Sequence, residues 1–177
     1  DPSAPFIRST IDGGYVSAAR LAGNQLVHIS DTDGLMVTDV GNASAPNVIN
    51  SVPGVLIGRL AVDGGRALTM SGGLKLWDIS NPYSGIPQLG TLTIPTGNPV
   101  VLSVALRGDR ACVGTYTYLH LYDVSDPATP AVIASVFGGD FVRNVAIHGD
   151  RLLATVDDLG LLVYDIGGSV PVLLGTY

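Results

Sequence analysis

The stretch LHLYDV, residues 119–124, decides the fold because three close copies of it stand elsewhere in the chain. All four copies begin with Leu and carry Asp at the fifth place. The other copies are LMVTDV (35–40), LKLWDI (74–79) and LLVYDI (161–166). Large or apolar residues occupy both pleat faces of these runs, which is typical of a strand in a sheet that is covered on both sides.

Two further series follow the same period. Prolines precede short β-type runs at intervals of 41, 41, 43 and 41 residues, at Pro5, Pro46, Pro87, Pro130 and Pro171. Two-residue hairpin turns of the kind that need a positive φ stand at Gly23-Asn24, Gly64-Gly65, Gly108-Asp109 and Gly149-Asp150. Each period therefore holds four short strands joined by tight turns, which is the signature of a β-propeller blade.

The series predict an all-β fold: a four-bladed β-propeller with four-stranded antiparallel blades and one surplus terminal strand. The expected blades cover about 16–54, 55–97, 98–139 and 140–177, and residues 1–15 form an N-terminal strand with a hinge. The composition agrees, because 23 Gly and 11 Pro favour turns, and the chain has no Glu and a single Lys, the usual surface residues of helices.

The charge balance narrows the function classes. The net charge of −6 argues against nucleic acid and anionic membrane surfaces as partners, since both need a basic footprint. No window reaches the roughly 18 uninterrupted apolar residues of a membrane helix, so we expect no membrane insertion. Cys112 stands alone in an apolar run, which excludes an internal disulfide and indicates a small buried side chain.

The segments LHLYDVSDPATP (119–130) and LKLWDISNP (74–82) resemble the LVIVD-repeat family of β-propellers. In that family an apolar-Asp-apolar step leads into Ser-Asn/Asp-Pro and a second Pro. Copies one and four depart from this pattern with Gly-Asn-Ala and Gly-Gly-Ser. The resemblance implies an extracellular or cell-surface location and a structural or adhesive role, without a defined activity. A start at Asp1 fits an exported chain after removal of its signal peptide, and equally a trimmed chain.

Strand counting leads to the preferred function. Four blades hold sixteen strands, and the leading run PFIRSTI adds a seventeenth, so it competes with the last run, PVLLGTY (171–177), for the outer edge of blade four. An unpaired apolar strand favours pairing with a neighbouring subunit. We predict a structural subunit of an extracellular filament, a homopolymer whose propellers exchange strands head to tail. The alternatives are a monomeric cell-surface adhesion or ligand-binding propeller, and half of a larger propeller ring.

The residues of this predicted contact lie near both ends of the chain. The N-terminal strand is the favoured donor, because the C-terminal strand closes a local hairpin, although Gly167-Gly168 could hinge that strand outward. The exchange strand comprises Phe6, Ile7, Arg8, Ser9, Thr10 and Ile11. The acceptor edge or competing strand comprises Leu161, Leu162, Val163, Tyr164, Val172, Leu173 and Leu174.

Residues that could carry chemistry have simpler structural interpretations. The four repeated Asp (Asp39, Asp78, Asp123 and Asp165) precede turns and are expected to hydrogen-bond their own backbone. Asp31, Asp33, Asp157 and Asp158 are weak calcium candidates, set against ordinary hairpin turns. Trp77, Tyr122 and Tyr164 share one register, which favours packing between blades over a sugar platform.

The remaining candidates are few. His28, His120 and His148 lack metal-ligand spacing, and we expect surface or half-buried packing for each. The sequon at 42–44 makes Asn42 a glycosylation acceptor if the protein is exported by a glycosylating organism. No nucleophile elbow or phosphate loop is present, so the sequence predicts no enzyme and no cofactor.

Overall fold

The computed structural model describes residues 7–11, 14–55, 58–95 and 100–177. Those residues form four sheets of four strands, here called blades A to D in chain order. Blade A consists of β1 (Val16–Ala22), β2 (Gln25–Ser30), β3 (Gly34–Asp39) and β4 (Asn47–Val52). Blade B consists of β5 (Arg59–Asp63), β6 (Arg66–Met70), β7 (Leu74–Asp78) and β8 (Gln88–Leu92), with a short 3-10 helix, η1 (Pro82–Ser84), before β8.

The second half of the chain repeats the plan. Blade C consists of β9 (Val101–Arg107), β10 (Arg110–Thr115), β11 (Tyr118–Asp123) and β12 (Ala131–Phe137). Blade D consists of β13 (Val142–His148), β14 (Arg151–Val156), β15 (Gly160–Asp165) and β16 (Val172–Thr176). The strands of every blade pair antiparallel with their chain neighbours, so the described residues contain only local hairpin pairing. The expected blades of four antiparallel strands are therefore confirmed.

The turn between the first two strands of each blade has the expected backbone. Its first residue is a glycine at positive φ, with values of 59°, 56°, 51° and 53° at Gly23, Gly64, Gly108 and Gly149. A Cβ at this conformation would be strained, which explains why all four turns carry glycine at the same place. These glycine turns therefore occupy the same place in every blade, between its first and second strands.

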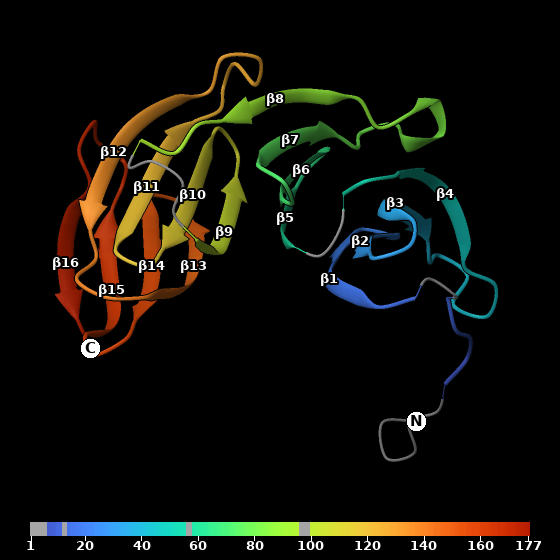
Figure 1. Cartoon of the computed structure of the whole chain (residues 1–177), viewed down its shortest axis with the longest axis horizontal. Helices are drawn as coiled ribbons and strands as arrows, with labels where there is room; N and C mark the ends of the chain where they lie inside the picture. Colours follow the sequence, from blue (N-terminus) through green and yellow to red (C-terminus); the bar gives the residue numbers. More distant parts are fainter. Residues whose placement is uncertain (1–6, 12–13, 56–57, 96–99) are drawn as a thin grey trace.

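The blades follow one another along an arc (Figure 1). The first strand of each blade is the innermost, and these strands contact one another in the order β1, β5, β9 and β13. Blades A and D lie at opposite ends of the arc in Figure 1. Among the described residues, every extensive contact between blades joins chain neighbours, and none joins blade D to blade A.

Three apolar clusters hold the blades together. One lies between blades A and B and includes Val27, Ile29 and Trp77. The next, between blades B and C, includes Leu68 and Tyr122. The third lies between C and D, with Cys112, Leu121 and Leu152 among its members. We call the face that a blade turns to its predecessor the leading face, and the face that it turns to its successor the trailing face.

The surplus strand is not formed in the described part of the N-terminal segment. Residues 7–11 belong to no sheet, whereas β16 occupies the outer edge of blade D. The described residues thus contain sixteen strands, and the seventeenth stays a prediction.

Candidate interface at the ends of the arc

The trailing face of blade D lacks the cover that the other trailing faces have. The exposure of the side chain can be compared at two equivalent positions in all four blades. The second-strand position is fully buried at Val27, Leu68 and Cys112, each at 0% exposure, whereas Leu153 is half-buried. The third-strand position is buried at Val37, Leu76 and Leu121, whereas Val163 is half-buried. Blade D therefore presents an apolar surface where its sisters meet a following blade.

Leu161 and Thr155 complete this surface. Thr155 is directly opposite Leu161 in the β14–β15 ladder, and Leu153 is opposite Val163, so all four side chains share one face. Thr155 is exposed and Leu161 is half-buried. We call these residues the blade D end face: Leu153, Thr155, Leu161 and Val163.

The leading face of blade A has a buried centre and an open rim. His28 and Met36 lie opposite each other in the β2–β3 ladder and are both buried. Thr38 is also buried, and neither its Oγ1 nor Nδ1 of His28 has a hydrogen-bond partner among the described residues. At the rim, Leu21 is 67% exposed. Buried polar atoms without partners are costly, so this face holds hydrogen-bonding capacity that the chain does not use.

The outer edge of blade D is also available. Backbone hydrogen bonds of 2.9 Å in both directions join Leu161 to Tyr177, so the C-terminal strand is firmly paired to β15. The side chains of Val172, Leu173 and Leu174 are exposed on β16. Of the other acceptor residues predicted from sequence, Leu162 and Tyr164 are buried against blade C and cannot contact another subunit.

The N-terminal segment lies apart from the sheets. Ile7 is 82% exposed, and Ser9 Oγ donates a hydrogen bond of 2.6 Å to the carbonyl of Ala43. Thr10 is exposed and Ile11 is half-buried. Arg8 is exposed and has an interaction within the chain. Phe6, the first residue of the predicted exchange strand, lies outside the described residues.

The repeated Asp residues build turns, as expected. The Oδ1 atoms of Asp39, Asp123 and Asp165 each accept a hydrogen bond of 2.8–2.9 Å from the backbone amide two residues later. Asp78 accepts both the amide and the hydroxyl of Ser80. These bonds lower the pKa of Asp78 and Asp123, through the side chain and then the backbone of Ser80 and Ser125. The four Asp are structural and do not meet in one site.

The calcium candidates fall into two separated turns. In blade A, Asp31 Oδ1 accepts the amide of Tyr15 and Asp33 Oδ2 accepts the hydroxyl of Thr32. In blade D, Asp157 is ion-paired with Arg143, while Asp158 has a left-handed backbone with φ 63°. Among the described residues, no group of three or more His, Cys or Asp side chains is placed to hold a metal ion.

Two of the three histidines contradict the sequence prediction. His28 and His120 are 2% and 0% exposed, so they are buried and not surface or half-buried residues, and only His148 is exposed. Their strands, β2 and β11, are each paired with a strand on both sides within the sheet. Burial lowers the pKa of both imidazoles. His120 Nδ1 lies 2.9 Å from Ser135 Oγ and forms a hydrogen bond with it.

The aromatic residues pack between blades. Trp77, Tyr122 and Tyr164 are all buried, one in each of the three apolar clusters. The indole of Trp77 donates to Thr69 Oγ1 at 2.8 Å, and the hydroxyl of Tyr122 donates to the carbonyl of Thr93 at 3.1 Å. These residues are therefore unavailable as a sugar platform.

Cys112 and Asn42 have opposite environments. Cys112 is fully buried, and desolvation raises the pKa of its thiol to about 12, which keeps the sulfur protonated and unreactive. Asn42 lies in an exposed turn, where its Oδ1 accepts the amide of Ser44 at 3.1 Å. Glycosylation of Asn42 stays a prediction.

The repeat sequence can now be compared with known proteins. Residues 13–53 and 101–137, which cover blades A and C, match the LVIVD repeat. The chain carries LVIVD repeats in blades A and C. The resemblance predicted from sequence is thus confirmed, although the match includes the divergent first copy and omits residues 74–82. No curated protein matches the chain in sequence.

Solved structures with similar folds have low sequence identity. The computationally designed Ika4 protein is 13% identical with a TM-score of 0.69, over 87% of this chain and 92% of that one. A protein from Lactobacillus plantarum is 17% identical with a TM-score of 0.73, and U3-55K is 12% identical with a TM-score of 0.71. This LVIVD-repeat chain aligns over 93% and 91% of its own length with those two proteins, but spans only 55% and 53% of theirs. The similarities support a β-propeller fold and carry no function.

Sequence reasoning named Leu161 and Val163 of the blade D end face, as part of the acceptor edge, but missed Leu153, Thr155 and two arginines on the inner strands. Leu153 and Thr155 follow the repeat and carry no local signal of exposure. Arg20 and Arg59 are recognisable only when the inner strands are aligned with one another. Within the described residues, no helix is long and apolar enough to span a membrane.

Proposed function

We propose that this LVIVD-repeat protein is a structural subunit that assembles head to tail into an extracellular filament. The observation that carries the proposal is the uncovered end face of blade D, because the equivalent faces of blades A to C are all buried against a following blade. The surface that complements a trailing face is a leading face. Blade A of a second copy supplies one at its rim, where Leu21 is 67% exposed, because His28, Met36 and Thr38 at the centre of that face are already buried within the chain.

Such a contact is heterologous, because it joins different surfaces of the two subunits. A heterologous contact generates either a closed ring or an open helical filament, according to whether its rotation closes. Full burial of an aliphatic side chain contributes about 1.5–3 kcal/mol. The half-buried Leu153, Leu161 and Val163 would each gain part of that amount, set against the cost of association.

The same arrangement accounts for the N-terminal segment. Within the chain, the segment that enters each inner strand comes from the outer strand of the preceding blade, as from β4 to β5 and from β8 to β9. When blade A of one copy follows blade D of another, residues 7–11 of the first copy lie beside β16 of the second. Ile7 and Thr10 are exposed in the single chain, and so are the β16 side chains. Pairing of this segment with the edge of β16 would be β-augmentation.

A second candidate is an eight-bladed ring formed by two copies or by a longer chain. It is favoured by the open arc and by the neighbours of which this chain spans 53–55%. It uses the same end faces but closes after eight blades. The two candidates differ in the size of the assembly and not in the residues of the contact.

Size-exclusion chromatography with light scattering, followed by negative-stain electron microscopy, tests the proposal on the full chain. We expect rods whose mass grows with concentration. A discrete particle of twice 18.2 kDa would favour the ring, and a stable 18.2 kDa monomer at all concentrations would overturn both candidates.

Two variants separate the end-face contact from strand exchange. Thr155→Arg places a charge on the blade D end face, and we expect it to abolish assembly while leaving the fold intact. The matched control is Thr91→Arg, at an exposed threonine on the outer strand of blade B, which should assemble normally. Deletion of residues 1–11 should weaken assembly if the segment is donated. Unchanged assembly after that deletion would overturn strand exchange and leave the end-face contact standing.

A further inference from the structure

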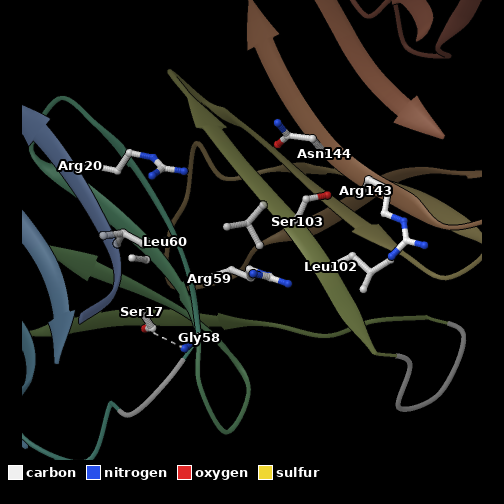
Figure 2. A pocket seen from close by; sticks show the side chains of 11 residues that line it. Ser17, Arg20, Gly58, Arg59, Leu60, Leu102, Ser103, Arg143 and Asn144 are labelled. Carbon is white, nitrogen blue, oxygen red and sulfur yellow. Dashed lines mark hydrogen bonds between the residues drawn. The ribbon is translucent and has the colours of Figure 1, made fainter. Parts of the chain in front are cut away.

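The four inner strands line an open cavity of about 200 Å³ at the axis of the arc, and the side chains of Arg20 and Arg59 in it are exposed. Every blade contributes at least two lining residues, so the cavity belongs to the arrangement of blades and not to one sheet. Figure 2 shows Arg20 and Arg59 extending from neighbouring strands toward the inner strands of blades C and D. Ser103, Arg143 and Asn144 line the opposite side.

The lining is basic in an acidic protein. It includes three arginines and no carboxylate, whereas the chain as a whole has a net charge of −6. Arg143 is neutralised at the rim by Asp157, to which its guanidinium donates at 3.0 and 2.8 Å. Arg20 and Arg59 have no such partner.

Five of the described arginines pair with aspartates. Ion pairs join Arg66 to Asp109, Arg107 to Asp63, Arg110 to Asp123, Arg143 to Asp157 and Arg151 to Asp165. Among the described residues, the side chain of Arg20 donates only to the carbonyl of Ala19, at 2.8 Å, and the side chain of Arg59 forms no hydrogen bond or ion pair. The two unpaired arginines of adjacent blades thus line the same cavity.

Both arginines are also departures from the repeat. At the third residue before the first hairpin glycine, three blades carry alanine (Ala61, Ala105 and Ala146), and blade A carries Arg20. Five residues before that glycine, blade B carries Arg59. Blades A, C and D carry the uncharged residues Ala18, Ser103 and Asn144 there. Residues two apart on a strand point to the same side, so the two substitutions face the same space. The blade architecture itself requires neither charge, because the other blades fold without it.

We propose that this axial cavity binds a small oxyanion, through the guanidinium groups of Arg20 and Arg59. Guanidinium presents a planar fork of donors that matches carboxylate, phosphate and sulfate oxygens. At roughly 30 Å³ for a water molecule, the cavity holds a group the size of phosphate with a few further atoms. A ligand would also relieve the repulsion between two cations that share one cavity.

The cavity lies on the inner strands, and the proposed filament contact centres on β14 and β15 of blade D, so either proposal can fail without the other. Thr155 lies opposite Asn144 of the cavity lining, so the monomeric background for binding is Val163→Asp, whose charge lies on β15 and not beside Asn144. The probes are inorganic phosphate and acetate, which separate a phosphate-type from a carboxylate-type ligand. Isothermal titration and amide chemical shifts of Ser103 and Asn144 report binding.

We expect saturable phosphate or acetate binding at millimolar concentration or below, weakened by added chloride. Arg59→Gln should weaken binding at least tenfold, and Arg20→Gln combined with Arg59→Gln should abolish it. The matched control, Arg110→Gln, removes the same charge outside the cavity and should bind as the unmodified chain does. Circular dichroism confirms the fold of each variant. Two results would overturn the proposal. One is that neither anion saturates the protein below 20 mM, which means a binding free energy weaker than about 2.3 kcal/mol. The other is equal binding by the double variant and the control.

Discussion

Asp63 of blade B accepts a hydrogen bond of 2.9 Å from Arg107 of blade C. The other oxygen of the same carboxylate accepts the amide of Gly108 at 2.7 Å. In return Arg66 of blade B donates to the carbonyl of Val124, at 2.8 Å. Neighbouring blades are thus joined by polar contacts at their turns as well as by the apolar cluster between them.

Asp63→Ala should lower the free energy of unfolding by about 1–2 kcal/mol, because it leaves the Gly108 amide and Arg107 without their acceptor. Urea denaturation provides the measurement. The control is Asp109→Ala, whose carboxylate is 64% exposed and 3.3 Å from Arg66, and which should cost less than about 0.5 kcal/mol. Equal losses in the two variants would contradict the assignment of the blade B–C contact to Asp63.

Gly90 marks a close approach between blades B and C. A Cβ at this residue would lie 1.9 Å from the carbonyl oxygen of Pro127. Gly90→Ala should therefore destabilise the fold by about 1–3 kcal/mol, since the backbone must move. Gly168→Ala is the matched control, because its Cβ would find nothing nearer than 3.9 Å. A thermal melt should show a large shift for the first variant and little change for the second.

His28→Leu should raise the free energy of unfolding of the single chain by about 1 kcal/mol, because the buried Nδ1 has no hydrogen-bond partner. The exposed His148→Leu serves as control and should change the free energy of unfolding by less than about 0.5 kcal/mol. Measurement at pH 7.5 keeps the His28 imidazole neutral, because burial lowers its pKa. A loss of stability in His28→Leu would indicate that Nδ1 is satisfied in solution.

The turn aspartates predict acid sensitivity. The pKa values of Asp78 and Asp123 are lowered in the fold, so their contribution to stability is present above the unfolded pKa of about 3.9. That contribution is lost as the pH falls below about 4 toward the folded-state values. The free energy of unfolding between pH 5 and 2 should therefore decline less steeply in the double variant Asp78→Asn, Asp123→Asn than in the unmodified chain. Identical slopes would contradict a role for these carboxylates.

Most of the fold could be predicted from sequence, and the reason is local. The sequence Leu-Tyr-Asp at 121–123 predicts the end of a strand from local residues alone, because Asp123 accepts the amide of Ser125 and so closes the following turn. Glycine at a required positive φ, as at Gly108, sets the hairpin that precedes it. Repetition of such signals at one period made the number and order of the blades predictable.

The ends of the arc could not be predicted in this way. Whether Leu153 meets another blade depends on the summed rotation of four blades, and no single residue encodes that angle. The burial of His28 could not be predicted for a similar reason. The alternation of side chains along β2 places His28 on one face of the sheet, but the sequence does not show whether that face is covered. Arg20 did carry a signal, since three sister blades have alanine at its position, but only the cavity gives that substitution a role.

Among the described residues the extensive contacts between blades join chain neighbours, and this has a consequence for cooperativity. Blades B and C are each held on two sides, whereas A and D are held on one, so opening should begin at the termini and spread inward, as in a linear array with nearest-neighbour coupling. Amide hydrogen exchange in β14 should then be faster than in β10, although both are second strands of their blades. Polymerisation would remove this difference in amide exchange between terminal and central blades, because every blade would then have two neighbours.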